Sequence, residues 1–155
     1  MNVIRYRTEL DTDKKNVLVK ESVMAYGENK IDNTRKIVDM VNELYHMNLF
    51  AEEYIYVVAF DTKMNLLGIF EVSHGIVNAS LCGNREIIIR CLLVGASCFM
   101  LLHNHPSGDC TPSQSDMDIT ENVKNASALV GISLLDHIII GGGNSYFSFK
   151  EKDMM

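Results

Sequence analysis

The stretch LLHNHPSGDCTPSQSD, residues 101–116, is the part of the sequence that says most about the fold and about a functional site. The apolar residues 98–102 predict a buried strand that runs into His103 and His105. Side chains two residues apart on a strand point to the same face of a sheet. We therefore expect both imidazoles to lie together at the end of a central strand.

The residues after this strand predict a turn and then a helix that points back at the strand end. Pro106, Gly108 and Pro112 break the strand, and Ser113 begins a helical pattern. Ser113 and Asp116 also match a capping box with an acidic residue at its third helical position. A carboxylate in a first helical turn is favoured in its ionised form, which is the form that binds metal. Capping and metal binding by Asp116 are thus compatible.

Two imidazoles and a carboxylate are a ligand set typical of a divalent zinc ion. Three protein ligands leave a fourth position for water, as in catalytic zinc sites. His103, His105 and Asp116 are therefore candidate metal ligands, the alternative being hydrogen-bonded histidines beside a helix cap. The Ser113 hydroxyl can accept from a helix N–H and still donate to a substrate oxygen. Cys110 is a less favoured competitor for the metal, because thiolates also bind zinc.

The flanking segments alternate between strand and helix patterns, which predicts an α/β fold with a mixed β-sheet and helices on its faces. Helices are predicted over residues 33–47, 84–94 and 113–130, with Asn33 and Asn84 as caps of the first two. Strands are predicted over residues 17–26, 54–60, 66–72, 98–102, 132–140 and 146–150. Residues 1–15 are expected to form an edge strand or a loose arm.

The length of 155 residues predicts one domain. We expect residues 1–50 to be an N-terminal strand and helix extension of that domain, and residues 51–155 to be its core. The N-terminus is too polar for a signal peptide, and no apolar run reaches the roughly 20 residues that span a bilayer. We therefore expect a cytoplasmic protein without a membrane partner, in which Cys82, Cys91, Cys98 and Cys110 are reduced thiols.

Three other polar positions have more than one interpretation. Glu71 lies near the end of an apolar strand, where a carboxylate is costly to bury without partners, so it is either solvated or beside a cation. His74 is predicted to be a loop histidine without metal contact. Asp136 and His137 are predicted either to orient a metal ligand or to form a hydrogen-bonded pair in the core.

The spacing H-x-H-x7-S-x2-D resembles the motif of the JAMM (MPN+) metalloproteases, and HNHPSGDCTPSQSD with LLDHIII resembles the RadC-like branch of that family. The resemblance extends over roughly residues 50–150. It implies a cytidine-deaminase-like α/β fold and a zinc ion held by His103, His105 and Asp116. It also implies that Glu71, in EVSHG, takes the proton from zinc-bound water and that Ser113 stabilises the oxyanion.

The leading hypothesis from this resemblance is a zinc-dependent metallopeptidase or isopeptidase that acts on a peptide or isopeptide substrate. The alternative is a DNA-repair or mobile-element accessory protein whose metal site is structural or binds a partner. The net charge of -6 gives no support to nucleic-acid binding, which needs a surplus of Lys and Arg. A nucleobase deaminase is excluded because the H-x-E and P-C-x-x-C motifs are absent from the sequence.

Overall fold

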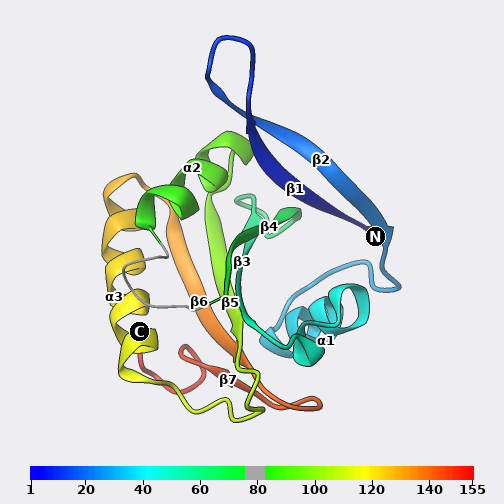
Figure 1. Ribbon diagram of the computed structural model, residues 1–155, viewed down its shortest axis with the longest axis vertical. Helices are drawn as coiled ribbons and strands as arrows, with labels where there is room; N and C mark the ends of the chain where they lie inside the picture. The colour runs from blue at the N-terminus through cyan, green and yellow to red at the C-terminus, as the bar shows by residue number, and fades with distance from the viewer. Residues whose placement is uncertain (76–82) are drawn as a thin grey trace.

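The computed structural model describes residues 1–75 and 83–155, which form a mixed seven-stranded sheet with helices on both faces (Figure 1). The strands follow the order β2-β1-β4-β3-β5-β6-β7 across the sheet. Their bounds are β1 Asn2–Leu10, β2 Asn16–Ala25, β3 Glu53–Phe60, β4 Leu66–Gly75, β5 Cys98–Asn104, β6 Ser133–Ile140 and β7 Tyr146–Ser148. The helices are α1 Thr34–Tyr45, α2 Asn84–Val94 and α3 Gln114–Leu129, with a 3-10 turn, η1, at Met47–Leu49.

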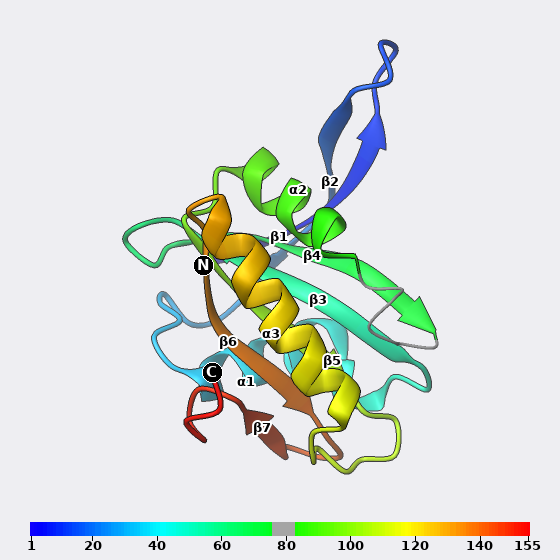
Figure 2. The ribbon, with the colours of Figure 1, turned by 90° about the vertical axis from the view of Figure 1, so that its left-hand side faces the viewer.

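The sheet contains both kinds of strand pairing, which confirms the predicted mixed α/β class. β1 pairs with β4 and β5 pairs with β6 in parallel, whereas the other neighbours are antiparallel. Because β1 has a partner on each side, the prediction that residues 1–15 form an edge strand or loose arm is wrong, and β2 is the edge. The β1–β2 hairpin projects beyond the rest of the sheet (Figure 2).

Helix α1 covers one face of the sheet, and α2 and α3 cover the other (Figures 1 and 2). Alternate residues along each strand therefore belong to different cores. Tyr56 and Leu102 lie in the core under α1, whereas Ile55 and Leu101 lie in the core under α2 and α3. This alternation shows to which face each polar side chain of the central strands belongs.

The helix ends follow local signals closely. Asn33 caps α1 as predicted, since its side chain accepts from the backbone N–H of Lys36 at 2.9 Å. The predicted Asn84 cap of α2 is wrong by one residue, because Gly83 occupies the N-cap position. Gly95 ends α2 as predicted, in the left-handed conformation that glycine adopts without a steric penalty, with φ of 73°.

Strand β7 ends two residues earlier than predicted because the chain turns there onto a buried carboxylate. Asp136 is fully buried, and its Oδ2 accepts from the hydroxyls of Ser148 at 2.6 Å and Thr34 at 3.4 Å. Its Oδ1 accepts from the Lys150 backbone N–H at 3.0 Å. Burial raises the pKa of Asp136, against the opposing effect of these hydrogen bonds. This carboxylate therefore ties β6 to β7 and to the start of α1.

The cysteines that the structure describes are free thiols, as predicted. Cys91 and Cys98 are buried, and burial raises the pKa of the Cys91 thiol to about 12, so that it is not a nucleophile at neutral pH. Cys82 lies outside the described residues. No helix within residues 1–75 and 83–155 is long and apolar enough to cross a membrane. The predicted division at residue 50 stays a prediction.

Replacing Asp136 tests its structural role. We expect Asp136→Asn to lower the free energy of unfolding by about 1–3 kcal/mol, because the new amide NH2 faces groups that donate hydrogen bonds. Asp118→Asn on the exposed face of α3 is the matched control and should change it by no more than about 0.5 kcal/mol. Urea denaturation of both variants gives these values, and equal stability would contradict the role assigned to Asp136.

Candidate metal centre

The end of the interior strand β5 and the first turn of helix α3 bring the candidate ligands together. Strand β5 carries His103, whose Cα pairs with Ile55 of β3 and Ile139 of β6. His105 follows the strand, and its backbone N–H donates to Ile140 O at 2.9 Å. Asp116 lies in the first turn of α3, on the face of the sheet to which His103 points. The side chains of His103, His105 and Asp116 are only 2%, 14% and 6% exposed.

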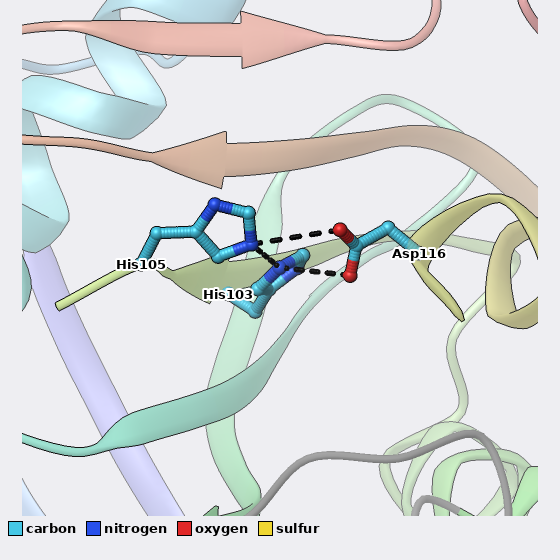
Figure 3. A group of neighbouring side chains, drawn as sticks. All are labelled: His103, His105 and Asp116. Carbon is cyan, nitrogen blue, oxygen red and sulfur yellow. Dashed lines mark hydrogen bonds and ion pairs between the residues drawn. The ribbon is translucent and has the colours of Figure 1, made fainter. Parts of the chain in front are cut away.

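The three side chains point their ligand atoms at one another (Figure 3). His103 Nε2 lies 3.1 Å from Asp116 Oδ1, and His105 Nε2 lies 3.5 Å from Asp116 Oδ2. The two Nε2 atoms are 2.9 Å apart. One ligand atom from each residue thus lies within 4.8 Å of the others, and among the described residues no other group of His, Cys, Asp or Glu does this. Cys110 is not part of the group.

The Nδ1 atom of each imidazole contacts a group outside the three candidate ligands, so the Nε2 atom is the one that faces the other ligands. His105 Nδ1 lies 2.7 Å from the Asp109 carbonyl oxygen, and a carbonyl only accepts, so this nitrogen carries the hydrogen. In the neutral ring, His105 Nε2 then presents a lone pair to Asp116. His103 Nδ1 lies 2.9 Å from His137 Nε2. Such outer contacts on the far side of the ring are the usual way in which metal-binding histidines are oriented.

The electrostatics of the centre fit a cation. Burial would raise the pKa of Asp116, but the hydrogen bond and charge of His103 and the hydrogen bonds from Ser113 outweigh it and hold that pKa well below its usual range. The carboxylate is therefore ionised at neutral pH, facing the Nε2 atoms of two imidazoles. Two imidazole nitrogens and a carboxylate oxygen are suitable donors for a divalent transition metal such as zinc.

Ser113 forms the predicted capping box with Asp116. Its hydroxyl accepts from the Asp116 backbone N–H at 3.2 Å, and the Ser113 backbone N–H donates to Asp116 Oδ2 at 2.7 Å. The Ser113 hydroxyl also donates to Asp116 Oδ2 at 2.7 Å. Its proton is thus engaged by the carboxylate, and donation to a substrate oxygen requires the hydroxyl to rotate.

Glu71 does not reach this centre, because it lies on the opposite face of the sheet. Its Cα pairs with Tyr56, which belongs to the core under α1, and Glu71 Oε2 accepts from the Tyr56 hydroxyl at 3.2 Å. The same oxygen pairs with Arg5 Nη2 at 2.7 Å, and Glu71 Oε1 lies 3.0 Å from His74 Nδ1. The expectation that Glu71 meets a cation agrees with this arrangement, but its expected role as proton acceptor for a metal-bound water does not.

A different glutamate, Glu53, lies on the face of the centre. It is the first residue of β3, two before Ile55, and so points to the same face as Ile55 and its neighbour His103. Glu53 and Pro106, the residue after His105, line the same open hollow. Glu53 is hard to identify from the sequence because the strand pattern begins at Tyr54 and because nothing local indicates that β3 lies beside β5.

The loop that contains Gly108 and Asp109, and that contacts the His105 ring, packs against the glycine-rich turn after β6. Gly142 N–H donates to Gly108 O at 2.9 Å. A Cβ on Gly141 would lie 2.6 Å from that same carbonyl oxygen and 3.2 Å from Cys110 Cβ. A larger residue at position 141 would clash with the Gly108 carbonyl, and the next residue in that loop, Asp109, provides the carbonyl that contacts His105.

Comparison with known proteins identifies relatives of the chain. A family model described as "RadC-like JAB domain" matches residues 31–154. A UPF0758 protein of Clostridium acetobutylicum is 39% identical over 126 residues, which are 81% of this chain and 54% of the relative. A UPF0758 protein of Clostridium tetani is 38% identical over 83% of this chain and 56% of its own length. A UPF0758 protein of Alkaliphilus metalliredigens is 42% identical over 70% of this chain and 47% of its own length. The chain thus spans about half the length of these relatives.

The packing of the two loops yields a test. Gly141→Ala should lower the free energy of unfolding by about 1–3 kcal/mol, because the added methyl meets backbone that must move. It should also weaken Zn²⁺ binding by roughly 10–100-fold through the displaced contact to His105. Gly27→Ala is the control, since its Cβ would meet nothing within 4 Å. Denaturation and chelator competition measure the two effects, and a Gly141→Ala protein that matches this control in both would contradict the loop's role.

Proposed function

Because this chain belongs to the RadC-like JAB domain family, we propose that it is a zinc-dependent hydrolase that cleaves a peptide or isopeptide bond. The observation that carries the proposal is the buried convergence of His103 Nε2, His105 Nε2 and the ionised Asp116 carboxylate. These residues would hold the metal. When bound, zinc would lower the pKa of a coordinated water to about 7 and polarise a substrate carbonyl.

Glu53 is the residue that would move the proton in this reaction. Strand alternation directs its side chain to the face that Ile55 shares with His103, whereas Glu71 pairs with Arg5 on the other face. A carboxylate beside an attacking water can accept its proton at Oε and pass it to the nitrogen of the leaving amine. We therefore assign to Glu53 the role that the sequence resemblance had given to Glu71.

Ser113 is the candidate for stabilising the oxyanion. Its hydroxyl is fixed at the start of α3 and donates to Asp116 Oδ2. If Asp116 turns this oxygen to a metal, the Ser113 hydroxyl can rotate towards the carbonyl oxygen of a substrate. One such donor typically contributes about 10²–10³ in kcat in acyl-transfer enzymes.

The surroundings of the centre support a polymeric substrate. The hollow beside Pro106 is open to solvent and is lined by Ala51, Glu52, Glu53 and Gly75. An open hollow of this kind can accommodate a peptide chain that passes across the end of the sheet, whereas small-molecule sites usually enclose most of their ligand.

Metal content is the first test. The purified protein saturated with Zn²⁺ should retain one zinc ion per chain after gel filtration, and Asp116→Ala should lose it. Asp118→Ala, on the same helix but exposed, should retain the metal. Elemental analysis gives the ratios. Zinc retained by Asp116→Ala at the parent's level would remove this centre from the proposal.

Two glutamate variants test the proton acceptor. Glu53→Gln should keep the zinc and lose hydrolysis of a peptide-library substrate by about 10²–10⁴-fold. Glu71→Gln should keep both zinc and hydrolysis, because this carboxylate lies on the far face. Cleavage rates are measured on zinc-loaded protein of verified stability. Loss of activity in Glu71→Gln alone would reverse the assignment.

The same assays separate the hydrolase from the accessory alternative. An accessory protein with a structural metal site should lose stability when Asp116 is replaced, yet show no cleavage that depends on Glu53. A hydrolase should show both dependences.

A further inference from the structure

A buried chain of hydrogen bonds links His103 to His137 and Thr120, on the side of His103 away from the other metal ligands. Neither His137 nor Thr120 is a candidate ligand. His137 on β6 is 1% exposed, and Thr120 on α3 is 4% exposed. The His137 ring is stacked on Phe149, with centroids 4.9 Å apart and planes 7° from parallel. Since water is excluded here, each polar hydrogen in the chain needs a protein acceptor.

The position of the hydrogen on Thr120 can be deduced from its two contacts. Thr120 Oγ1 lies 2.6 Å from the backbone oxygen of Asp116 and 2.6 Å from His137 Nδ1. The Asp116 carbonyl can only accept, so the single hydroxyl proton of Thr120 is donated to it. Thr120 Oγ1 must then accept from His137, and His137 Nδ1 therefore carries the hydrogen.

The same deduction extends to His103. His137 is 1% exposed, and its two ring nitrogens lie against Thr120 Oγ1 and His103 Nδ1, neither of which is a carboxylate, so a charged ring here would be buried without a counter-ion. The ring is therefore neutral, and with its hydrogen on Nδ1 it has none on Nε2. This Nε2 lies 2.9 Å from His103 Nδ1 and must accept from it. His103 thus carries a hydrogen on Nδ1, so that in the neutral ring, which is the form that binds metal, the Nε2 lone pair faces Asp116.

We propose that Thr120 and His137 are positioning residues that lock His103 in the tautomer that binds metal. The inference rests on the proposed function, because the lock is useful only if the centre binds a metal. Thr120 Oγ1 bonds the backbone oxygen of Asp116 and the ring of His137, and its hydroxyl thereby sets the direction of the hydrogen bond from His103 to His137.

Removing the Thr120 hydroxyl would reverse which atoms donate and which accept in this chain of hydrogen bonds. Without Thr120 Oγ1, His137 Nδ1–H has no acceptor, and the neutral ring places its hydrogen on Nε2 instead. His103 Nδ1 must then accept, so the His103 hydrogen moves to Nε2 and points at His105 and Asp116. A metal can enter only after this tautomer is reversed, at the expense of affinity.

A matched pair of variants tests the lock. Thr120→Val keeps the shape and removes the hydroxyl, whereas Thr120→Ser keeps the hydroxyl. Affinity for Zn²⁺ alone is measured by competition with a chromophoric chelator, and stability by denaturation without metal. Thr120→Val should bind roughly 10–100-fold more weakly, in the range typical of outer contacts to metal ligands, while Thr120→Ser should bind like the parent. Equal affinities for Thr120→Val and Thr120→Ser would overturn the proposal.

A second pair acts on the histidine itself. His137→Gln keeps an oxygen that can accept from His103 Nδ1–H, whereas His137→Phe keeps an aromatic ring for stacking on Phe149 and offers no acceptor. We expect His137→Gln to retain more of the zinc affinity than His137→Phe. The reverse order would contradict a role for His137 as acceptor.

A spectroscopic measurement makes the test independent of metal binding. Nitrogen-15 shifts of the imidazoles in metal-free protein should show the hydrogen of His137 on Nδ1 in the parent and in Thr120→Ser, and on Nε2 in Thr120→Val. A parent protein with the His137 hydrogen on Nε2 would overturn the lock. A parent that shows the expected tautomer and binds no zinc would instead overturn the proposed hydrolase.

Discussion

The structure depends on one electrostatic constraint, which is the close approach of two imidazole nitrogens and an ionised carboxylate in a nearly dry space. His103 and His105 bring their Nε2 atoms to 2.9 Å, and Asp116 closes the group with 3.1 and 3.5 Å contacts. Burying such an acceptor-rich group is unfavourable unless a positive charge lies among its members. A divalent cation bound there would satisfy this need and would link the fold to the proposed chemistry.

The pairing of β5 with β3 and with β6 determines which residues surround His103. β5 lies between β3 and β6, so His103 has Ile55 as a neighbour on one side and Ile139 on the other. The shift in the pairing of β5 with β6 between Phe99 and Met100 sets which β6 side chains share a face with His103. His137 is thereby brought against His103 Nδ1, and Asp136, its neighbour in sequence, is directed into the opposite core.

Local patterns predicted the centre, and long-range pairing decided the rest. His103, His105 and Asp116 could be predicted because strand periodicity and a helix cap act within sixteen residues of sequence. The faces to which Glu71 and Glu53 point depend on how β3 pairs with β4 and β5, which no local pattern encodes. Likewise β1 resembles an edge strand until its parallel pairing with β4 is known. Residue types could therefore be predicted more easily than the faces they occupy.

The most direct test of the central claim is X-ray absorption of the zinc-loaded protein, which reports the atoms bound to the metal. The account predicts nitrogen and oxygen neighbours at about 2.0–2.2 Å, with the multiple-scattering pattern of two imidazoles. A sulfur neighbour at about 2.3 Å would assign the metal to a cysteine instead. That result, or a spectrum without imidazole scattering, would contradict a centre built from His103, His105 and Asp116.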